Sequence, residues 1–309
     1  MLVEVLARGV AVGLARMQQE EAAMRARVQF EQFFTPELSH ELTANPDLLK
    51  GRDATISVLF CDIRGFSRIS EILGPAGTVD WLNDVMTVFS ECVLKHSGVL
   101  VDYIGDELMA MWGAPIAVED HARRATLAAL SMIDQLPALR ERWQKRIGEP
   151  MEIGIGINSG MARVGNTGTQ RKFKYGPLGN NVNLASRLQG ATKYLKTRLL
   201  VSGATQKLLG PEFATRRLTT VRVVNIVEPV ELFEVVPQGE EGWKQRKTDY
   251  EEALAFFEGQ EFRAAARILG GLVTDYREDG PALVLLSRVV NALIEPPEPF
   301  DPVWQLPGK

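Results

Sequence analysis

Two aspartates in the sequence stand where they could hold metal ions beside phosphate groups. Asp62 ends the apolar stretch of VLFCDIRGFS, and Asp106 follows a glycine between two apolar runs in VDYIGDELMAMWGAP. Carboxylates bind Mg²⁺ next to substrate phosphates in many proteins. Two of them brought together could hold two ions, one activating an attacking hydroxyl group and the other neutralising charge on a triphosphate. The pair therefore predicts a magnesium site for phosphoryl chemistry.

Each aspartate also has a purely structural explanation when it is taken alone. Asp62 could cap the turn that precedes the helical segment SRISEIL, and Gly105-Asp106 is an ordinary pair of residues for a hairpin turn. The metal hypothesis therefore depends on the two carboxylates meeting in space.

A third stretch, YGPLGNNVNLASRLQGA, offers an amide and a guanidinium group on one helix face. Asn183 and Arg187 are four positions apart, which places them on the same side of a helix. The amide can orient a sugar oxygen, and the guanidinium can meet charge that develops on a phosphoryl group. The alternative is a helix face that is merely solvated.

The three stretches together resemble the catalytic motifs of the class III adenylyl and guanylyl cyclases, and the resemblance extends over residues 54–236. It implies a set of groups that contact metal and phosphates: the carboxylates of Asp62 and Asp106, the carbonyl of Ile63, and the backbone of Gly65 and Phe66. It also implies that Mg²⁺ or Mn²⁺ is the cofactor, with two ions per site.

The resemblance assigns Asn183 to orientation of the ribose and Arg187 to stabilisation of the transition state. In this family the sites lie between two catalytic domains, one supplying the metal carboxylates and the other supplying the asparagine and the arginine. One such domain per chain implies a homodimer, and a twofold arrangement would give two identical sites. The implied reaction is attack of the ribose 3′-oxygen on the α-phosphorus of a purine nucleoside triphosphate, with release of pyrophosphate.

Two positions that read the base in this family differ from the residues usual in adenylyl cyclases. Asp102 stands where those enzymes usually carry lysine, and Gly176 stands where they usually carry aspartate or threonine. An ionised carboxylate would accept hydrogen bonds from N1–H and the 2-amino group of guanine, as in guanylyl cyclases. Most bacterial members are adenylyl cyclases, so ATP and GTP both stay open. Asp102 could also be a strand residue that faces water.

A lysine that many members use for the terminal phosphates is missing from VRVVNIVEPVELF. Arg217, Arg222, Lys172 or Lys174 could substitute for it. This departure and the unusual base positions keep a second hypothesis open, a weak or silent cyclase-like module that binds nucleotide and regulates a partner. Retention of the two aspartates, the asparagine and the arginine favours the active enzyme.

The elements that must position these residues alternate between strands and helices. Runs such as ATISVLF and MEIGIGI are β-rich, and Val79 to Leu94 carries apolar residues at the spacing of one buried helix face. Strands joined partly by tight hairpins predict an α+β sandwich with a mixed or antiparallel sheet. The resemblance implies the ferredoxin-like cyclase sandwich.

Three segments are expected along the chain: residues 1–53, 54–237 and 238–309. The first carries apolar residues at heptad spacing, predicting an amphipathic signalling helix and a linker. It resembles the end of a GAF-type sensor, so a sensor domain or partner could act through it. The second is the catalytic domain. The third resembles a tetratricopeptide-type helical hairpin with a tail, and such a hairpin needs a neighbour to cover its apolar face.

The composition excludes several other classes of protein. With 309 residues and a net charge of −4, the chain has no broad basic surface for nucleic acid. Cys61 and Cys92 are not arranged as a disulfide scaffold or a zinc site. No apolar run approaches the roughly 18 residues of a membrane span. We therefore expect a cytoplasmic protein without a membrane span in this chain.

Overall fold

The computed structural model describes residues 13–14, 16–17, 19–21, 47, 50–169, 172–222, 228–240 and 242–305. The chain divides into two compact units, residues 1–50 and 51–309. In the first unit, the described residues from 13 to 21 are helical and Met17 is exposed. Most of the predicted signalling helix lies outside the described residues. The expected boundaries at residues 53 and 237 remain predictions.

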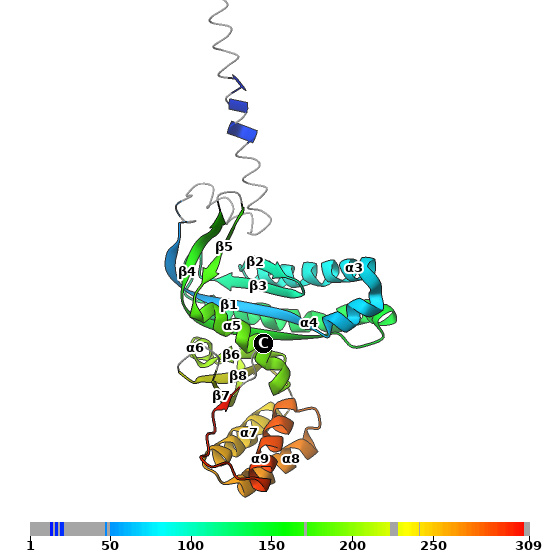
Figure 1. Cartoon of the computed structure of the whole chain (residues 1–309), viewed down its shortest axis with the longest axis vertical. Helices are drawn as coiled ribbons and strands as arrows, with labels where there is room; N and C mark the ends of the chain where they lie inside the picture. Colours follow the sequence, from blue (N-terminus) through cyan, green and yellow to red (C-terminus); the bar gives the residue numbers. More distant parts are fainter. Residues whose placement is uncertain are drawn as a thin grey trace, which may run out of the picture. The chain divides into compact units, whose positions relative to one another are not determined.

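The second unit is built around one mixed sheet (Figure 1). Its order among the described residues is β2-β3-β1-β4-β6-β8-β7-β9, with β5 paired to β4. The strands are β1 (Arg52–Arg64), β2 (Val99–Ile104), β3 (Glu107–Trp112), β4 (Glu152–Thr169), β5 (Lys172–Leu178), β6 (Leu199–Ser202), β7 (Ala214–Arg222), β8 (Val230–Val236) and β9 (Trp304–Gln305). Most neighbours are antiparallel, whereas β4–β6 and β7–β9 are parallel. This confirms the predicted α+β class.

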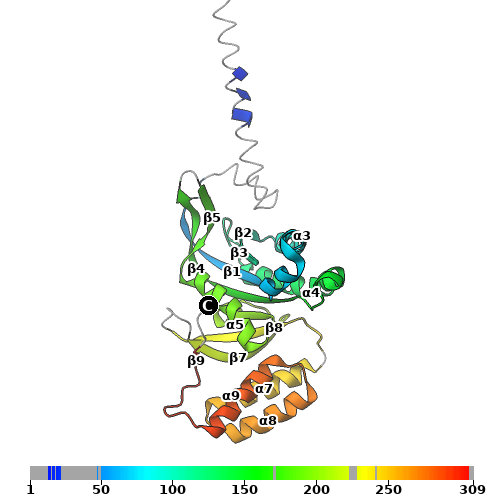
Figure 2. The same ribbon diagram turned by 45° about the vertical axis from the view of Figure 1, so that its right-hand side comes forward.

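The helices of the second unit cover both faces of the sheet (Figure 2). They are α3 (Phe66–Lys95), α4 (His121–Ile147), α5 (Asn180–Leu195), α6 (Gly203–Gln206), α7 (Trp243–Glu258), α8 (Phe262–Asp275) and α9 (Gly280–Ile294). No helix within the described ranges is both long and apolar enough to cross a membrane.

One core lies between the sheet and helices α3 and α4. Leu59, Cys61 and Ile63 of β1 are buried there together with Trp81 and Phe89 of α3. Because successive side chains of a strand point to opposite faces, these odd-numbered positions leave Asp62 on the other face, where α5 packs.

A second core joins α5 to the C-terminal helices. The residues that α5 contributes are Leu184, Leu188, Ala191 and Leu195, and they are clustered with side chains of α7, α8 and α9. The predicted hairpin corresponds to α7 and α8, and α9 extends it by one helix. The apolar face that the hairpin needs to cover is therefore covered by α5 and the sheet.

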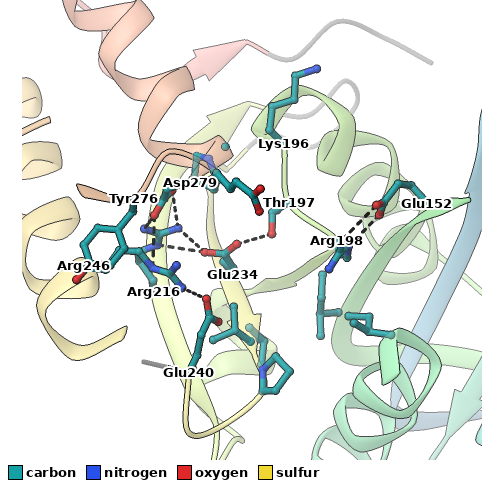
Figure 3. Close-up of a pocket in the computed structure, with 18 of the residues that line it drawn as sticks. Glu152, Lys196, Thr197, Arg198, Arg216, Glu234, Glu240, Arg246, Tyr276 and Asp279 are labelled. Carbon is teal, nitrogen blue, oxygen red and sulfur yellow. Dashed lines mark hydrogen bonds and ion pairs between the residues drawn. The ribbon is translucent and has the colours of Figure 1, made fainter. Parts of the chain in front are cut away.

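A buried arginine links the C-terminal helices to the sheet (Figure 3). Arg216 of β7 is 1% exposed, and its guanidinium pairs with Glu234 of β8 and with Asp279 at the start of α9, both at 2.6 Å. The guanidinium also lies over the ring of Tyr250 in α7. Although burial lowers the pKa of Arg216, the two carboxylates raise it above its usual value overall. Arg216 is therefore charged and fully paired at this junction.

Candidate active site

Strand pairing brings the two predicted metal carboxylates to one end of the sheet. Asp62 of β1 is paired in register with Glu107 of β3, and Asp106 immediately precedes Glu107 in the turn from β2 to β3. The turn is made by Gly105 at a φ of 67°, a conformation that side chains with a Cβ rarely adopt. The register of β1 against β3 therefore places the two aspartates at the same end of the sheet.

Asp62 faces the helix that carries the third motif. Gln189 of α5 donates a hydrogen bond to the Asp62 carboxylate at 3.3 Å. Cys61, the residue before Asp62, points into the core between the sheet and helices α3 and α4. Burial there, and then the negative charges of Asp62 and Glu107, raise the pKa of the Cys61 thiol well above its usual value. Cys61 is thus a neutral packing residue, whereas Asp62 is half-buried.

The backbone beyond Asp62 turns sharply into a helix. Ile63 lies past the last pair of the β1–β3 ladder and remains paired with Ile153 of β4. Gly65 has a φ of 73° and precedes α3, whose first turn receives no side-chain cap from the residue before it. Phe66 opens the helix with its ring stacked on Trp81, at a centroid distance of 5.8 Å. Backbone N–H groups at such a helix start can bind phosphate oxygens.

Two glycines of β4 allow α5 to lie close against the sheet. A Cβ atom at Gly156 would be 2.1 Å from the backbone nitrogen of Gln189, and one at Gly154 would be 2.2 Å from the hydroxyl oxygen of Thr192. The glycines alternate in MEIGIGI with buried isoleucines, and that alternation was the available sequence signal for a helix packed tightly on this strand.

The face of α5 that meets the sheet is not the face that carries the predicted catalytic pair. At 100° per residue around the helix axis, the directions of Asn183 and Arg187 differ by about 40°, whereas those of Gln189 and Arg187 differ by about 160°. Asn183 is exposed and Arg187 is half-buried. Within the described residues, neither side chain makes a hydrogen bond or an ion pair. Gln189, on the sheet-facing side of α5, is thus a residue that contacts Asp62 within the same chain.

The start of α5 is fixed by the side-chain amides of two asparagines. Asn158 of β4 donates to the backbone carbonyl of Asn181, and the Asn181 amide donates to the carbonyl of Met161. Asn158 in turn accepts a hydrogen bond from Ser202 at 2.6 Å. These bonds hold the first turn of the helix, and with it Asn183, against β4.

The two positions expected to read the base lie side by side, on β2 and β5. A Cβ atom at Gly176 would be 2.8 Å from a methyl carbon of Val101, the residue before Asp102. The Asp102 carboxylate is engaged, because Lys174 of β5 forms an ion pair with it at 2.6 Å. The backbone N–H of Tyr103 donates to its other oxygen at 2.9 Å. The sequence did not predict the ion pair with Lys174.

Two of the other cations suggested for the terminal phosphates are also engaged. Arg217 pairs with Glu231 and Glu258, and Arg222 pairs with Asp301. The side chain of Lys172 lies outside the described residues.

The acidic residues fit an open metal site that is completed by a substrate. Among the residues that the structure describes, no group of three or more His, Cys, Asp or Glu side chains could enclose a metal ion. Mg²⁺ bound beside nucleotides usually keeps several waters and takes only one or two carboxylates from the protein, with substrate phosphates as further ligands. Asp62 and Asp106 match that donor set.

Comparison with known families and proteins points in one direction. Residues 49–231 match the family described as the adenylate and guanylate cyclase catalytic domain. Adenylate cyclase 1 of Rhizobium meliloti (strain 1021) is 34% identical over 182 residues, covering 59% of this chain and 27% of the relative. Guanylate cyclase soluble subunit beta-2 of Rattus norvegicus is 31% identical over 152 residues, covering 49% and 22%. The chain thus spans about a quarter of the length of these relatives.

Solved structures give the same result for the fold. The adenylyl cyclase CyaB from P. aeruginosa matches with a TM-score of 0.58 and 30% identity, covering 62% of this chain and 99% of that structure. The guanylyl cyclase Cya2 matches with a TM-score of 0.56 and 31% identity, covering 62% and 96%. The cyclase fold expected from the sequence motifs is confirmed, and the similarity to adenylyl and guanylyl cyclases is equally strong.

Proposed function

The chain belongs to the adenylate and guanylate cyclase family, and on that premise we propose that it converts a purine nucleoside triphosphate, ATP or GTP, to the 3′,5′-cyclic monophosphate and pyrophosphate. The observation that carries the proposal is the register of β1 and β3, because it makes neighbours of Asp62 and Asp106 at one end of the sheet. The side chains of Asn183 and Arg187 on one face of α5, which have no partner among the described residues, supply the second half of the machinery.

Asp62 and Asp106 hold Mg²⁺ or Mn²⁺ in this proposal, with the Ile63 carbonyl as a further oxygen ligand and two ions per site. Ions held there would supply activation of the ribose 3′-hydroxyl group and neutralisation of charge on the triphosphate. The backbone N–H groups of Gly65 and Phe66 bind phosphate oxygens at the start of α3.

Arg187 stabilises the charge that develops on the α-phosphate, and Asn183 orients the ribose. Both side chains are available for these roles, because no other described residue engages them. Cyclisation is an intramolecular attack, so alignment of the 3′-oxygen with the phosphorus contributes more than a strong protein base would.

The active form in this proposal is a homodimer. Within one chain, α5 presents Gln189 to Asp62 and turns Asn183 and Arg187 away. A second copy related by a twofold axis can bring its own Asn183 and Arg187 to the carboxylates, giving two equal sites. Exposed apolar side chains near the base positions would be covered in such a dimer: Tyr103, Ile104, Met161 and Leu178.

A product assay tests the activity. The purified chain is incubated with ATP or GTP and with Mg²⁺ or Mn²⁺, and cyclic nucleotide is measured beside the Asp62→Asn variant. We expect product from the native chain and a loss of at least about 100-fold in the variant, since it removes a metal ligand. Equal product from both proteins would contradict the proposed metal site.

A second candidate is a silent cyclase-like module that binds nucleotide and regulates a partner. It is favoured by the engagement of Arg217 and Arg222 in ion pairs, which leaves them unavailable to the terminal phosphates. Nucleotide binding without cyclic product, under both metals and with both nucleotides, would support this candidate and exclude the enzyme.

A further inference from the structure

We propose that Gln189 is a positioning residue of the metal site, and that its side-chain amide holds the Asp62 carboxylate in the orientation that binds the ion. The inference rests on the proposed cyclase function and deepens it, because it adds a residue of α5 to the metal half of the site. The sequence motifs gave this glutamine no role.

The side chain of Gln189 directs its hydrogen bond to Asp62. The Nε2 atom donates to Oδ2 of Asp62 at 3.3 Å, and the amide makes no other hydrogen bond within the described residues. Most side-chain hydrogen bonds in proteins go to backbone groups or to water. Gln189 is 5% exposed. It is therefore a buried amide whose one bond to the protein goes to a proposed metal ligand.

The backbone of Gln189 is held against the strand next to β1. A Cβ atom at Gly156 of β4 would be 2.1 Å from the backbone nitrogen of Gln189 and 2.8 Å from its Cα atom. The hydroxyl group of Thr192 donates to the backbone carbonyl of Gln189 at 2.6 Å. The amide is thus presented to Asp62 from a fixed backbone position, so the contact needs little further ordering.

A glycine leaves room for the contact. Gly154 of β4 is the register partner of Asp62 on β1. A Cβ atom there would be 3.4 Å from Nε2 of Gln189 and 2.2 Å from the hydroxyl oxygen of Thr192. A side chain at residue 154 would therefore push α5, and the amide with it, away from Asp62. The contact depends on the absence of a side chain directly opposite this aspartate.

A neutral donor suits a carboxylate that must also bind a cation. One amide N–H occupies one of the roughly four lone-pair sites of a carboxylate and leaves the others for an ion. The carboxylate also keeps its negative charge, whereas a lysine or arginine at this position would form an ion pair and compete with the metal. Loss of a hydrogen bond that orients a metal ligand typically costs about 10–100-fold in metal affinity or activity. Gln189 fits this orienting role without itself contacting the ion.

The test uses Mn²⁺ alone as the probe, and its binding to the full chain is measured by the loss of the free-ion EPR signal. Gln189→Met keeps the length of the side chain and removes the donor, so the dissociation constant should rise about tenfold. Gln189→Asn keeps the amide but is one methylene shorter, and it should weaken binding in the same direction. Thr192→Val removes a buried hydroxyl group from the same side of α5 and should leave the dissociation constant unchanged. Urea unfolding shows that each variant is folded.

The activity assay gives a readout that a merely structural role would not move. In Gln189→Met, the Mn²⁺ concentration that gives half of the maximal rate should rise about tenfold, because the ligand is less well oriented. The value of kcat at saturating Mn²⁺ should fall less than about threefold, since the ion restores the same site once it is bound. A fall in kcat with an unchanged Mn²⁺ requirement would overturn the inference.

Asp62→Asn separates this inference from the proposed function. If Asp62→Asn binds Mn²⁺ as tightly as the native chain, the proposed metal site fails, and the role of Gln189 fails with it. If Asp62→Asn weakens binding by at least about tenfold while both glutamine variants bind like the native chain, the metal site stands and the role of Gln189 is overturned. Equal weakening in Thr192→Val would also overturn it, because the effect would then come from the packing of α5.

Discussion

Helix α5 lies between two regions that differ in how their arginine side chains are paired. On the face that we propose to be catalytic, Arg187 is half-buried and has no partner among the described residues. At the junction with the C-terminal helices, Arg216 is buried and held by Glu234 and Asp279 (Figure 3). The first arginine is available to a ligand, and the second is fully used by the protein.

The difference indicates which arginine stabilises the fold and which is available for function. A buried guanidinium is tolerated only when carboxylates and hydrogen bonds compensate for its lost hydration, so Arg216 belongs to the folded framework. Thr197, just beyond α5, donates to Glu234 at 2.6 Å and joins the end of α5 to that framework. The junction thereby supports α5 on one side, and the contacts that we propose with substrate and a second subunit lie on another side of the helix.

The largest effect should come from the open face. Replacing Arg187 with alanine removes the proposed transition-state contact, so kcat should fall about 10²–10³-fold. The free energy of unfolding should change by less than about 0.5 kcal/mol, since no described side chain depends on this arginine. Rates of cyclic nucleotide formation and urea unfolding measure the two quantities. Lys193→Ala, an exposed change on the same helix, should alter neither, and a large loss of stability in Arg187→Ala would contradict the distinction.

Arg216→Met should show the opposite pattern. The substitution leaves Glu234 and Asp279 buried without their main partner, so we expect about 3–5 kcal/mol of destabilisation in urea unfolding. Where the variant is still folded, its kcat should fall far less than that of Arg187→Ala. The neighbouring Arg217→Met breaks ion pairs whose side chains are 28% exposed or more and should cost about 1 kcal/mol or less. Equal stability of the two variants would show that Arg216 is not a special anchor.

A smaller effect is expected from a buried histidine in the framework. Burial lowers the pKa of His121 and Asp120 partly offsets this, so the folded chain favours the neutral imidazole, which is hydrogen-bonded to Ser57. The unfolded chain binds a proton below pH about 6.5, so this contribution to stability is present above that pH and is lost as the pH falls towards the lower folded pKa. His121→Gln should therefore flatten the pH dependence of the free energy of unfolding between about pH 5 and 7. Identical slopes in the two proteins would rule this out.

The parts of the site that follow from short-range patterns were predictable from the sequence. Asp106 lies in a hairpin turn that Gly105, with its positive φ, makes possible. Asn183 and Arg187 share a helix face because they are four residues apart. The strand and helix patterns also gave the α+β class. In each of these cases the geometry is fixed within a few residues, so the chain need not be folded in full to infer it.

The ion pairs were not predictable, because long-range register decides them. Lys174 meets Asp102 across 72 positions of sequence, and only the placement of β5 beside β2 brings them together. Arg216 meets Asp279 across 63 positions, through the packing of α9 on the sheet. The sequence around a basic residue does not indicate which distant carboxylate it will pair with. Lys174 was therefore grouped with the phosphate candidates, although the structure pairs it with a base position.

The division of the site between two chains is the central claim, and mixed dimers test it most directly. Asp62→Asn and Arg187→Ala chains carrying different tags are co-expressed, and dimers holding one of each are purified through both tags. Each variant alone should be inactive, whereas the mixed dimer should recover about half of the native activity, because one of its two sites combines an intact Asp62 with an intact Arg187. Mixed dimers as inactive as their parents, or chains that cannot be purified as a pair, would contradict the claim.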